Sequence, residues 1–356
     1  MQDVRIVLLG LGNVGGALLR QIVETRTILA ERAGLRLRPL ALADVSGALI
    51  HPDGLDDAAL TEALAAASAG RLLESLSGVR PLGEVEPLLG PGVILADVTA
   101  SPRTERTVRR ALAAGCAVAL ANKLALAGPW AESGPLFGQP QLRYEVTVGA
   151  GLPVIAALRY LLDTGDHVTR IEGCLSGTLG YLCAELERGA PYSAAVSQAR
   201  ALGYTEPDPR EDLAGRDVAR KALILARTAG WPLDLDALSV ERLYRAELAD
   251  LSVDEFLAAM PSDDAAYAQR VAQAAAQDRV LRYVARVTTQ GGEVGLLAVE
   301  RSSALGALRG PGNHIALYTE RYATVPLVIA GPGAGPDVTA AGVLGDLIAL
   351  AREGQA

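Results

Sequence analysis

Two lysines are the residues of this sequence whose chemistry is hardest to replace. Lys123 and Lys221 are its only lysines, so the remaining 31 of its 33 basic residues are arginines. Arginine suffices wherever a surface charge is needed, but its guanidinium stays protonated, whereas a lysine ammonium can lose its proton. Unless the two lysines remained by chance, they therefore indicate proton transfer, the chemistry of a general acid or base.

The neighbours of Lys221 favour a role in a site. Asp217 precedes it by four residues within a helical pattern, a spacing that places both side chains on one face of the helix. Upstream, residues 203–209 carry prolines at alternate positions, which remove donors and force extended backbone, and so predict a stiff loop that presents Glu206. An exposed acid–lysine pair is usually a solvated salt bridge, but the scarcity of lysine favours function here.

A glycine-rich turn follows the first predicted strand. Residues 4–9 form a continuous apolar run, residues 10–15 read GLGNVG, and a helical pattern begins at residue 14. In a G-x-G-x-x-G turn between a strand and a helix, the glycines allow close approach of a pyrophosphate, whose charge the helix N-terminus stabilises. The alternative is an ordinary glycine-rich turn. The position predicts a dinucleotide site formed by Gly10, Gly12, Asn13, Val14 and Gly15.

Asp44 ends the second predicted strand. A carboxylate at this point can accept hydrogen bonds from the adenosine ribose and repel a 2′-phosphate, which favours NAD over NADP. Asp44 lies 29 residues after Gly15, however, whereas the usual spacing is about 20 residues. A longer first helix would explain the difference, and an ordinary turn residue before Ser46 is the alternative. The choice between NAD and NADP stays open.

Two further strand ends carry polar residues. The run DVTAS at residues 97–101 follows an apolar strand, and Asn122 and Lys123 end the next one. Ligands of doubly wound sheets bind at the carboxyl ends of the strands. We therefore expect both segments beside the nicotinamide, with Lys123 contacting cofactor or substrate, although a solvated strand-end charge is the alternative.

Strands and helices alternate in the first part of the chain. Apolar strand-like runs lie at residues 4–9, 37–43, 93–96 and 117–121, with helical patterns at 14–30 and 103–114. This alternation predicts an α/β fold whose N-terminal domain, residues 1–150, is a Rossmann-type doubly wound parallel sheet.

The pattern changes after about residue 150. Helical segments at residues 153–162, 178–188, 193–202 and 212–228 precede strands at 280–287, 294–299 and 327–330. They predict a separate α+β domain over residues 151–330, which we expect to be the substrate-binding and catalytic half of the chain. The segment 331–356, with a helix at 338–351, is expected to complete the dinucleotide-binding domain.

Composition excludes several classes of protein. The net charge is −8 and the arginines form no basic patch, so nucleic acid is not an expected partner. The first apolar stretch is too short and glycine-rich to span a membrane, and no export signal precedes it. Cys116, Cys174 and Cys183 show no metal-ligand spacing and cannot all pair. We expect buried thiols in a cytoplasmic protein.

Four segments resemble the homoserine dehydrogenase family, which interconverts aspartate 4-semialdehyde and L-homoserine in the biosynthesis of threonine, methionine and isoleucine. They are YEVTVGAGLP at residues 144–153, EGCLSGTLGYL at 172–182, GYTEPDPREDLAGRDVARK at 203–221 and GAGPDVTAAGVLGDL at 333–347. Together with the glycine turn they span nearly the whole chain in the family's order.

The resemblance implies roles for individual residues. Lys221 is the general acid/base, and Lys123 stabilises the developing alkoxide near nicotinamide and substrate. Glu206 and Asp217, two carboxylates, would hold the substrate ammonium, and Asp217 also supports catalysis. Further positions that match the family are Gly177 and Thr178 for substrate, and Thr99, Ala100, Gly203 and Gly335 for NAD or NADP.

The resemblance also implies features beyond the reaction. Glu145, with the carbonyls of Val148, Ala150 and Leu152, matches a structural monovalent-cation site, and hard oxygen ligands fit Na⁺. Relatives form homodimers through the second domain. Many bacterial relatives carry a C-terminal regulatory ACT domain, whereas this chain ends at Ala356, so we expect a short form without threonine feedback.

Two other functions are compatible with the same motifs. One is a Rossmann-fold oxidoreductase that acts on another small amino or hydroxy acid. The other is a sensor that binds NAD(H) without chemistry, for which Lys221 would be dispensable.

Overall fold

The computed structural model describes residues 1–354. The chain divides into two compact units. The first consists of Met1–Gly151 and the chain from Ala334 onwards, and the second is Leu152–Gly333. Of the C-terminal segment 331–356 expected from the sequence, residues 355 and 356 lie outside the described residues.

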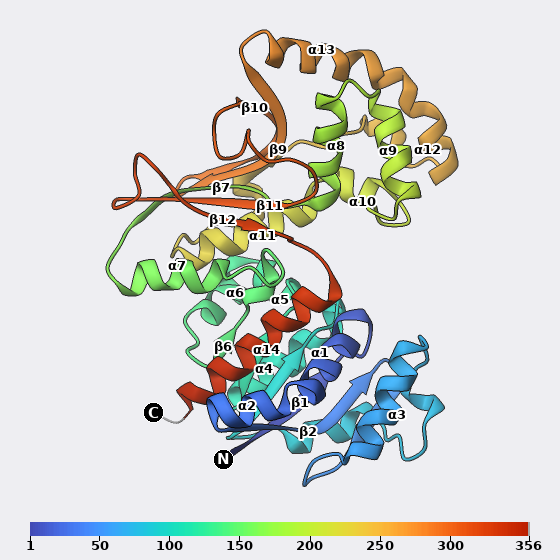
Figure 1. The fold of residues 1–356 in the computed structure, drawn as a ribbon, viewed down its shortest axis with the longest axis vertical. Helices are drawn as coiled ribbons and strands as arrows, with labels where there is room; N and C mark the ends of the chain where they lie inside the picture. Colours follow the sequence, from blue (N-terminus) through green and yellow to red (C-terminus); the bar gives the residue numbers. More distant parts are fainter. Residues whose placement is uncertain (355–356) are drawn as a thin grey trace. The chain divides into compact units, whose positions relative to one another are not determined.

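A six-stranded sheet forms the centre of the first unit (Figure 1). Its strand order is β3-β2-β1-β4-β5-β6, so the order reverses between β1 and β4. All neighbours are parallel except β3, which pairs antiparallel with β2. The strands are β1 (Gln2–Leu9), β2 (Leu35–Asp44), β3 (Gly47–Ile50), β4 (Val93–Asp97), β5 (Ala117–Leu120) and β6 (Leu142–Arg143).

The helices of the first unit follow from apolar faces that pack on this sheet. Leu18 and Ile22 of α1 share one buried cluster with Val343 and Leu347 of α14, the last helix of the chain. α14 also contacts β4 and β5, so a segment distant in sequence completes this unit (Figure 1). The helices are α1 (Asn13–Glu24), α2 (Arg26–Ala33), α3 (Asp57–Ser68), α4 (Glu105–Ala113), α5 (Leu124–Ala127), α6 (Trp130–Phe137) and α14 (Pro336–Glu353), with short 3-10 turns η1 (Leu73–Ser75), η2 (Leu82–Leu88), η3 (Pro102–Thr104) and η4 (Glu145–Thr147).

The second unit contains a mixed six-stranded sheet of order β12-β11-β7-β9-β10-β8. Neighbours are antiparallel except β8, which runs parallel to β10. The strands are β7 (Val168–Cys174), β8 (Leu238–Val240), β9 (Arg279–Thr288), β10 (Gly291–Glu300), β11 (Asn313–Thr319) and β12 (Leu327–Gly331).

Helices of the second unit pack on this sheet and on one another. α11 contacts β7 and β9, and α8 contacts β9 and α9. The helices are α7 (Val154–Asp163), α8 (Gly177–Glu187), α9 (Tyr192–Ala201), α10 (Arg210–Leu213), α11 (Arg216–Thr228), α12 (Val253–Ala259) and α13 (Asp264–Ala275), with 3-10 turns η5 (Leu235–Ala237), η6 (Ala246–Leu248) and η7 (Met260–Asp263). The predicted fold class, a Rossmann-type sheet plus an α+β domain, is confirmed.

Two predicted helices are each broken in the structure. The helix expected over residues 14–30 ends at Glu24, and α2 begins after Thr25, whose hydroxyl donates to the carbonyl of Gln21. The helix expected over 212–228 breaks at Gly215, where φ is +68°. A β-carbon there would lie 1.9 Å from the Tyr283 hydroxyl oxygen, so only glycine fits.

The three cysteines of the chain are buried thiols. Cys116, Cys174 and Cys183 are free and buried, as predicted, and burial raises the pKa of Cys174 to about 12 and that of Cys183 to about 11. Such thiols stay protonated and unreactive. Among residues 1–354, no helix combines the length and hydrophobicity needed to cross a bilayer.

Candidate active site

The glycine turn of the first unit has the geometry of a phosphate-binding loop. It connects β1 to α1, and Gly10 adopts φ +98°, where residues with side chains are strained. A β-carbon on Gly15 would lie 1.8 Å from the Gly10 carbonyl oxygen, so helix and turn meet too closely for any side chain. A β-carbon on Gly12, in contrast, would meet no atom of residues 1–354 within 4 Å. Space is therefore open at Gly12, the N-cap of α1, where an anion can approach the helix N-terminus.

The turn after β4 lies directly against this loop. A β-carbon on Gly10 would be 3.1 Å from the Thr99 methyl carbon and 3.3 Å from the Thr99 nitrogen. Thr99 donates from its hydroxyl and its backbone N–H to Asp97 at 2.7 and 3.0 Å. Thr99 and its neighbour Ala100 thus lie at the carboxyl edge of the sheet, beside the glycine loop, at the point where the strand order reverses.

Lys123 follows β5 at the same edge. Its neighbour Asn122 is buried, and the Asn122 amide donates to the Ser101 carbonyl at 2.8 Å and to the Thr104 hydroxyl at 3.2 Å. The Asn122 side-chain oxygen accepts from the backbone N–H of Leu124. These bonds tie the end of β5 to the turn after β4 and fix the backbone that carries the half-buried Lys123.

Asp44 is the last residue of β2, as predicted, but its carboxylate already has protein partners. Oδ1 accepts from the backbone N–H and hydroxyl of Ser46 at 2.8 and 2.6 Å, and Oδ2 accepts from the Leu73 N–H at 2.7 Å. Contacts of this kind are typical of an ordinary turn residue before Ser46, which was the alternative interpretation of Asp44. Each oxygen can accept more than one hydrogen bond, so contact with a ribose stays a prediction.

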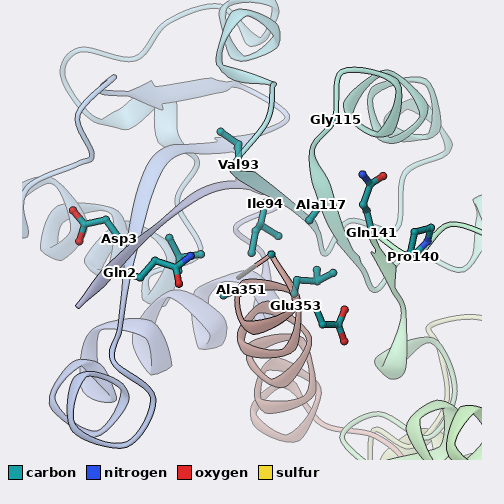
Figure 2. A pocket seen from close by; sticks show the side chains of 14 residues that line it. Gln2, Asp3, Val93, Ile94, Gly115, Ala117, Pro140, Gln141, Ala351 and Glu353 are labelled. Carbon is teal, nitrogen blue, oxygen red and sulfur yellow. The ribbon is translucent and has the colours of Figure 1, made fainter. Parts of the chain in front are cut away.

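Gly335 is the N-cap of α14, with φ +127°. A cavity of about 420 Å³ marks the opposite end of this helix, and Figure 2 shows it lined by Glu353 together with Gln2, Val93 and Ala117 near the starts of β1, β4 and β5. The C-terminus of α14 therefore lies at the amino edge of the sheet, and its N-terminus lies toward the carboxyl edge. The cavity itself is on the wrong edge for a dinucleotide.

The second unit contains the predicted pair on α11. The Lys221 ammonium donates to Asp217 Oδ2 at 2.8 Å, which confirms the shared helix face, and to the Leu175 carbonyl at 2.7 Å. The Lys221 side chain is only 12% exposed, against 51% for Asp217. Lys221 is therefore not the freely solvated cation of an ordinary surface salt bridge. Leu175 immediately precedes the N-cap of α8, so Lys221 lies beside the segment that contains Gly177 and Thr178.

A carboxylate that sequence reasoning missed organises the loop before α10. Asp212 Oδ1 accepts from the Thr178 hydroxyl at 3.0 Å, and Oδ2 accepts from the Glu206 backbone N–H at 2.8 Å. The Thr178 hydroxyl also lies 2.6 Å from the Tyr204 carbonyl. Asp212 lies within residues 203–221, one of the segments that resemble the family, and this resemblance is the sequence feature that could have indicated a role for Asp212. It joins the Glu206 loop to the start of α8.

Acidic groups face one another in this part of the second unit. Partial desolvation, followed by the negative charges of Asp212, Glu211 and Asp217, raises the pKa of Glu206. Burial is the largest cause that raises the pKa of Asp212. Repulsion between these carboxylates is relieved when a cation joins them, so the arrangement suits a ligand with an ammonium group.

Arg210 holds the loop that presents Glu206. Its guanidinium donates to both carboxylate oxygens of Asp208 at 2.7 to 3.0 Å. It also donates to the carbonyls of Ala249 and Leu251 at 2.8 and 2.6 Å. Residues 202–209 contain neither helix nor strand, so the predicted loop is confirmed, and the bonds of Arg210 add to the restraint that the prolines impose on it.

The remaining predicted positions are distributed over both units. Gly203 belongs to the second unit, where φ +72° ends α9, and not to the glycine loop. Glu145, Val148 and Ala150 lie in the first unit, in and just after η4, whereas Leu152 is the first residue of the second. Roles for these residues in cofactor or cation binding stay predictions.

Comparison with known proteins decides the family. A model of the family described as homoserine dehydrogenase matches residues 153–348. The homoserine dehydrogenase of Emericella nidulans is 42% identical over 273 residues, which cover 72% of this chain and 74% of that protein. The chain belongs to the homoserine dehydrogenase family. This confirms the family predicted from the sequence.

Two further proteins similar to this chain are a longer relative and a more distant solved structure. The chloroplastic bifunctional aspartokinase/homoserine dehydrogenase 2 of Zea mays is 38% identical over 97% of this chain, which spans only 38% of that protein. A hyperthermophilic archaeal homoserine dehydrogenase, solved in complex with NADPH, superposes with a TM-score of 0.75 at 24% identity, covering 99% of this chain and 98% of that one. At this identity the likeness shows the fold alone.

Proposed function

We propose that the chain is a homoserine dehydrogenase, an NAD(P)-dependent oxidoreductase that interconverts L-homoserine and L-aspartate 4-semialdehyde. The observation that carries the proposal is the environment of Lys221, a largely buried ammonium 2.8 Å from Asp217 and 2.7 Å from the Leu175 carbonyl. A buried lysine beside acidic groups is suited to acid/base chemistry on a substrate that carries its own ammonium.

Lys221 supplies the proton of the reaction. Two of its three N–H groups are directed to Asp217 and to the Leu175 carbonyl, which leaves one to donate to the substrate oxygen. When the aldehyde is reduced, negative charge develops on that oxygen and the ammonium protonates it. In the reverse direction neutral Lys221 accepts the hydroxyl proton, and Asp217 favours the ammonium that results. The nicotinamide, when bound, donates or accepts the hydride.

Substrate recognition rests on charge. We assign the substrate ammonium to Glu206 and Asp217, with Gly177 and Thr178 lining the site at the start of α8. Lys123, the only other lysine, is assigned to the developing alkoxide and to the cofactor. A small amino acid with a terminal hydroxyl or aldehyde fits these groups.

The first unit is assigned to the dinucleotide. Open space at Gly12 and the contact of Thr99 with Gly10 support a pyrophosphate at the glycine loop, with Ala100 and Gly335 at the same edge. Asp44 favours NAD, whereas the archaeal relative was solved with NADPH, so both cofactors belong in the assay.

Gly12→Ala tests the cofactor loop separately from the fold. Its β-carbon would meet no atom of the described residues within 4 Å, so we expect the free energy of unfolding to change by no more than about 1 kcal/mol. The Kd of the dinucleotide should rise about tenfold or more, because the added methyl occupies the approach of the pyrophosphate. Gly15→Ala is the matched control, since its β-carbon would collide with the Gly10 carbonyl and should destabilise the fold itself. Unchanged cofactor affinity in Gly12→Ala would remove this loop from the site.

The assay that tests the function follows absorbance at 340 nm. Purified protein is supplied with L-homoserine and either NAD⁺ or NADP⁺, and then with related amino and hydroxy acids. We expect turnover of homoserine with at least one cofactor and much slower turnover of the related compounds. Cofactor binding without turnover of any of them would favour the sensor, and preference for another alcohol would favour the other oxidoreductase.

We also propose the structural cation at the turn after η4. Gly149 and Ala150 have φ +82° and +53°, and a positive φ at alanine indicates backbone held by its surroundings. The Glu145 carboxylate and the carbonyls of Val148 and Ala150 are hard oxygen ligands that fit Na⁺. The ion would stabilise this turn and take no part in the reaction.

A homodimer is proposed through the second unit. On one face of its sheet, Glu172 pairs with Arg170 at 3.2 Å and with Arg286 at 2.7 Å, and near the edge strand β12 the apolar Val325 and Val328 are 74% and 38% exposed. Exposed apolar groups beside a charged network are typical of an interface. We expect a dimer by sedimentation and a shift toward monomer in Val325→Asp. A monomeric wild-type protein at micromolar concentration would exclude this assembly.

For the cell, we propose a cytoplasmic enzyme of threonine, methionine and isoleucine biosynthesis.

A further inference from the structure

Asp97 is a buried carboxylate for which the proposed reaction has no role. It is the last residue of β4 and only 1% exposed, at the carboxyl edge of the sheet in the first unit. The turn that follows it places Thr99 against Gly10 of the glycine loop. Asp97 therefore lies beneath the surface that the dinucleotide is assigned to occupy.

Both carboxylate oxygens of Asp97 accept hydrogen bonds. Oδ1 accepts from the N–H and hydroxyl of Thr99, and Oδ2 accepts from the Thr104 hydroxyl at 2.7 Å. The Asn122 amide donates to the hydroxyls of Thr99 and Thr104, at 3.4 and 3.2 Å, so each hydroxyl can direct its own hydrogen at Asp97. The Thr104 hydroxyl also lies 3.1 Å from the Ser101 carbonyl, which is longer than its 2.7 Å contact with Asp97. A network polarised in this way solvates a carboxylate anion.

These partners are all neutral. The Asp97 carboxylate accepts from two threonine hydroxyls and one backbone N–H, and the neutral Asn122 amide also acts to lower its pKa. Burial raises the pKa of Asp97, while the hydrogen bonds from Thr104 and Thr99 oppose that rise. Among the described residues the Asp97 carboxylate is held by dipoles and not by an ion pair, so the field of its charge extends into the surroundings.

The position of Asp97 points to the nicotinamide half of the cofactor. In this sheet the glycine loop and the end of β2 lie on one side of the reversal, and a dinucleotide bound across it places its second nucleoside over β4 and β5. The oxidised nicotinamide ring carries a positive charge and the reduced ring is neutral. A fixed anion nearby therefore interacts differently with the two forms.

We propose that Asp97 is a specificity-determining residue for the redox state of the cofactor: its buried charge stabilises the bound oxidised nicotinamide relative to the bound reduced one. The inference rests on the proposed function only for the class of cofactor. Asp97 need not touch the ring, because the effect acts through the field of one charge in a region of low dielectric constant.

The test compares the affinities of oxidised and reduced cofactor in Asp97→Asn and in the wild-type protein. The Kd of NADH and of NADPH is measured by their fluorescence, and that of NAD⁺ and of NADP⁺ by calorimetry, without substrate. Asparagine keeps the size and an acceptor oxygen but removes the charge. We expect the ratio of the Kd of the oxidised form to that of the reduced form to rise about tenfold in the variant.

The control is Thr104→Val, which removes one hydrogen bond from Oδ2 and keeps the carboxylate. It should change both affinities alike, as would any merely structural damage to the turn. If Asp97→Asn does not fold, as judged by its circular dichroism and melting, Asp97→Ser removes the same charge with a smaller side chain.

Equal weakening of both redox forms by the Asp97 variant would overturn the inference while leaving dinucleotide binding intact. A wild-type protein that binds none of the four dinucleotides would instead contradict the proposed function, and the inference with it.

Discussion

Lys221→Arg should lower kcat for homoserine oxidation about 100-fold or more, with the affinity for cofactor little changed. Arginine keeps the positive charge that pairs with Asp217, so the loss would measure what a guanidinium cannot do, which is to release and regain a proton. Steady-state kinetics at saturating homoserine give kcat, and fluorescence of the reduced cofactor gives its affinity. Lys221→Ala should lose at least as much activity.

A guanidinium is larger than an ammonium, and the Lys221 side chain is only 12% exposed, so Lys221→Arg also needs a control for folding. Arg216→Lys, at an exposed position of the same helix, is the control for changes in α11 and should retain wild-type activity. Melting temperatures close to that of the wild-type protein would show that both variants fold. Activity that survives in Lys221→Arg would mean that another group transfers the proton.

Glu206→Gln should raise the KM for homoserine about tenfold or more, because the neutral amide no longer attracts the substrate ammonium. The cofactor affinity should stay unchanged, since Glu206 belongs to the second unit and the glycine loop to the first. Burial, followed by the negative charges of neighbouring carboxylates, raises the pKa of Glu206, and a cation that joins this cluster relieves the repulsion.

Glu211→Gln provides the matched control for Glu206. It removes a nearby charge of the same type from α10. The hydrogen bond from the Glu206 backbone N–H to Asp212 does not involve Glu211 and should remain. The general loss of negative charge should affect the homoserine KM much less than the loss of Glu206 does. Equal KM values in the wild-type protein and Glu206→Gln would remove Glu206 from the substrate site.

Local sequence signals predicted the parts of the site that depend on local geometry. The strand before Gly10 is recognisable from its continuous apolar run. The motif requires glycine at residue 10, where φ is +98°, and at residue 15, which lies against the Gly10 carbonyl. The spacing of Asp217 and Lys221 predicts a shared helix face, and the prolines predict the loop of Glu206. In each case neighbours along the chain determine the conformation.

Contacts between distant segments could not be predicted in the same way. β7 and β11 were not recognised as strands, because their sequences, VTRIEGC and NHIALYT, mix polar and apolar residues. These two strands pair with each other although their paired residues lie 140 or more positions apart in the sequence. Gly215 breaks a helix because of Tyr283, far along the chain. The roles of Asp97 and Asp212 likewise depend on hydrogen bonds that only the fold creates.

Chemical rescue of Lys221→Ala tests the central claim, proton transfer by Lys221, most directly. Small primary amines, added to the variant with homoserine and cofactor, should restore turnover in proportion to their concentration and in an order that follows their pKa. Guanidinium ions of similar size should restore none, because they supply charge without a transferable proton. Equal rescue by guanidinium and by amines would show that the site requires only a positive charge, and would contradict the role assigned to Lys221.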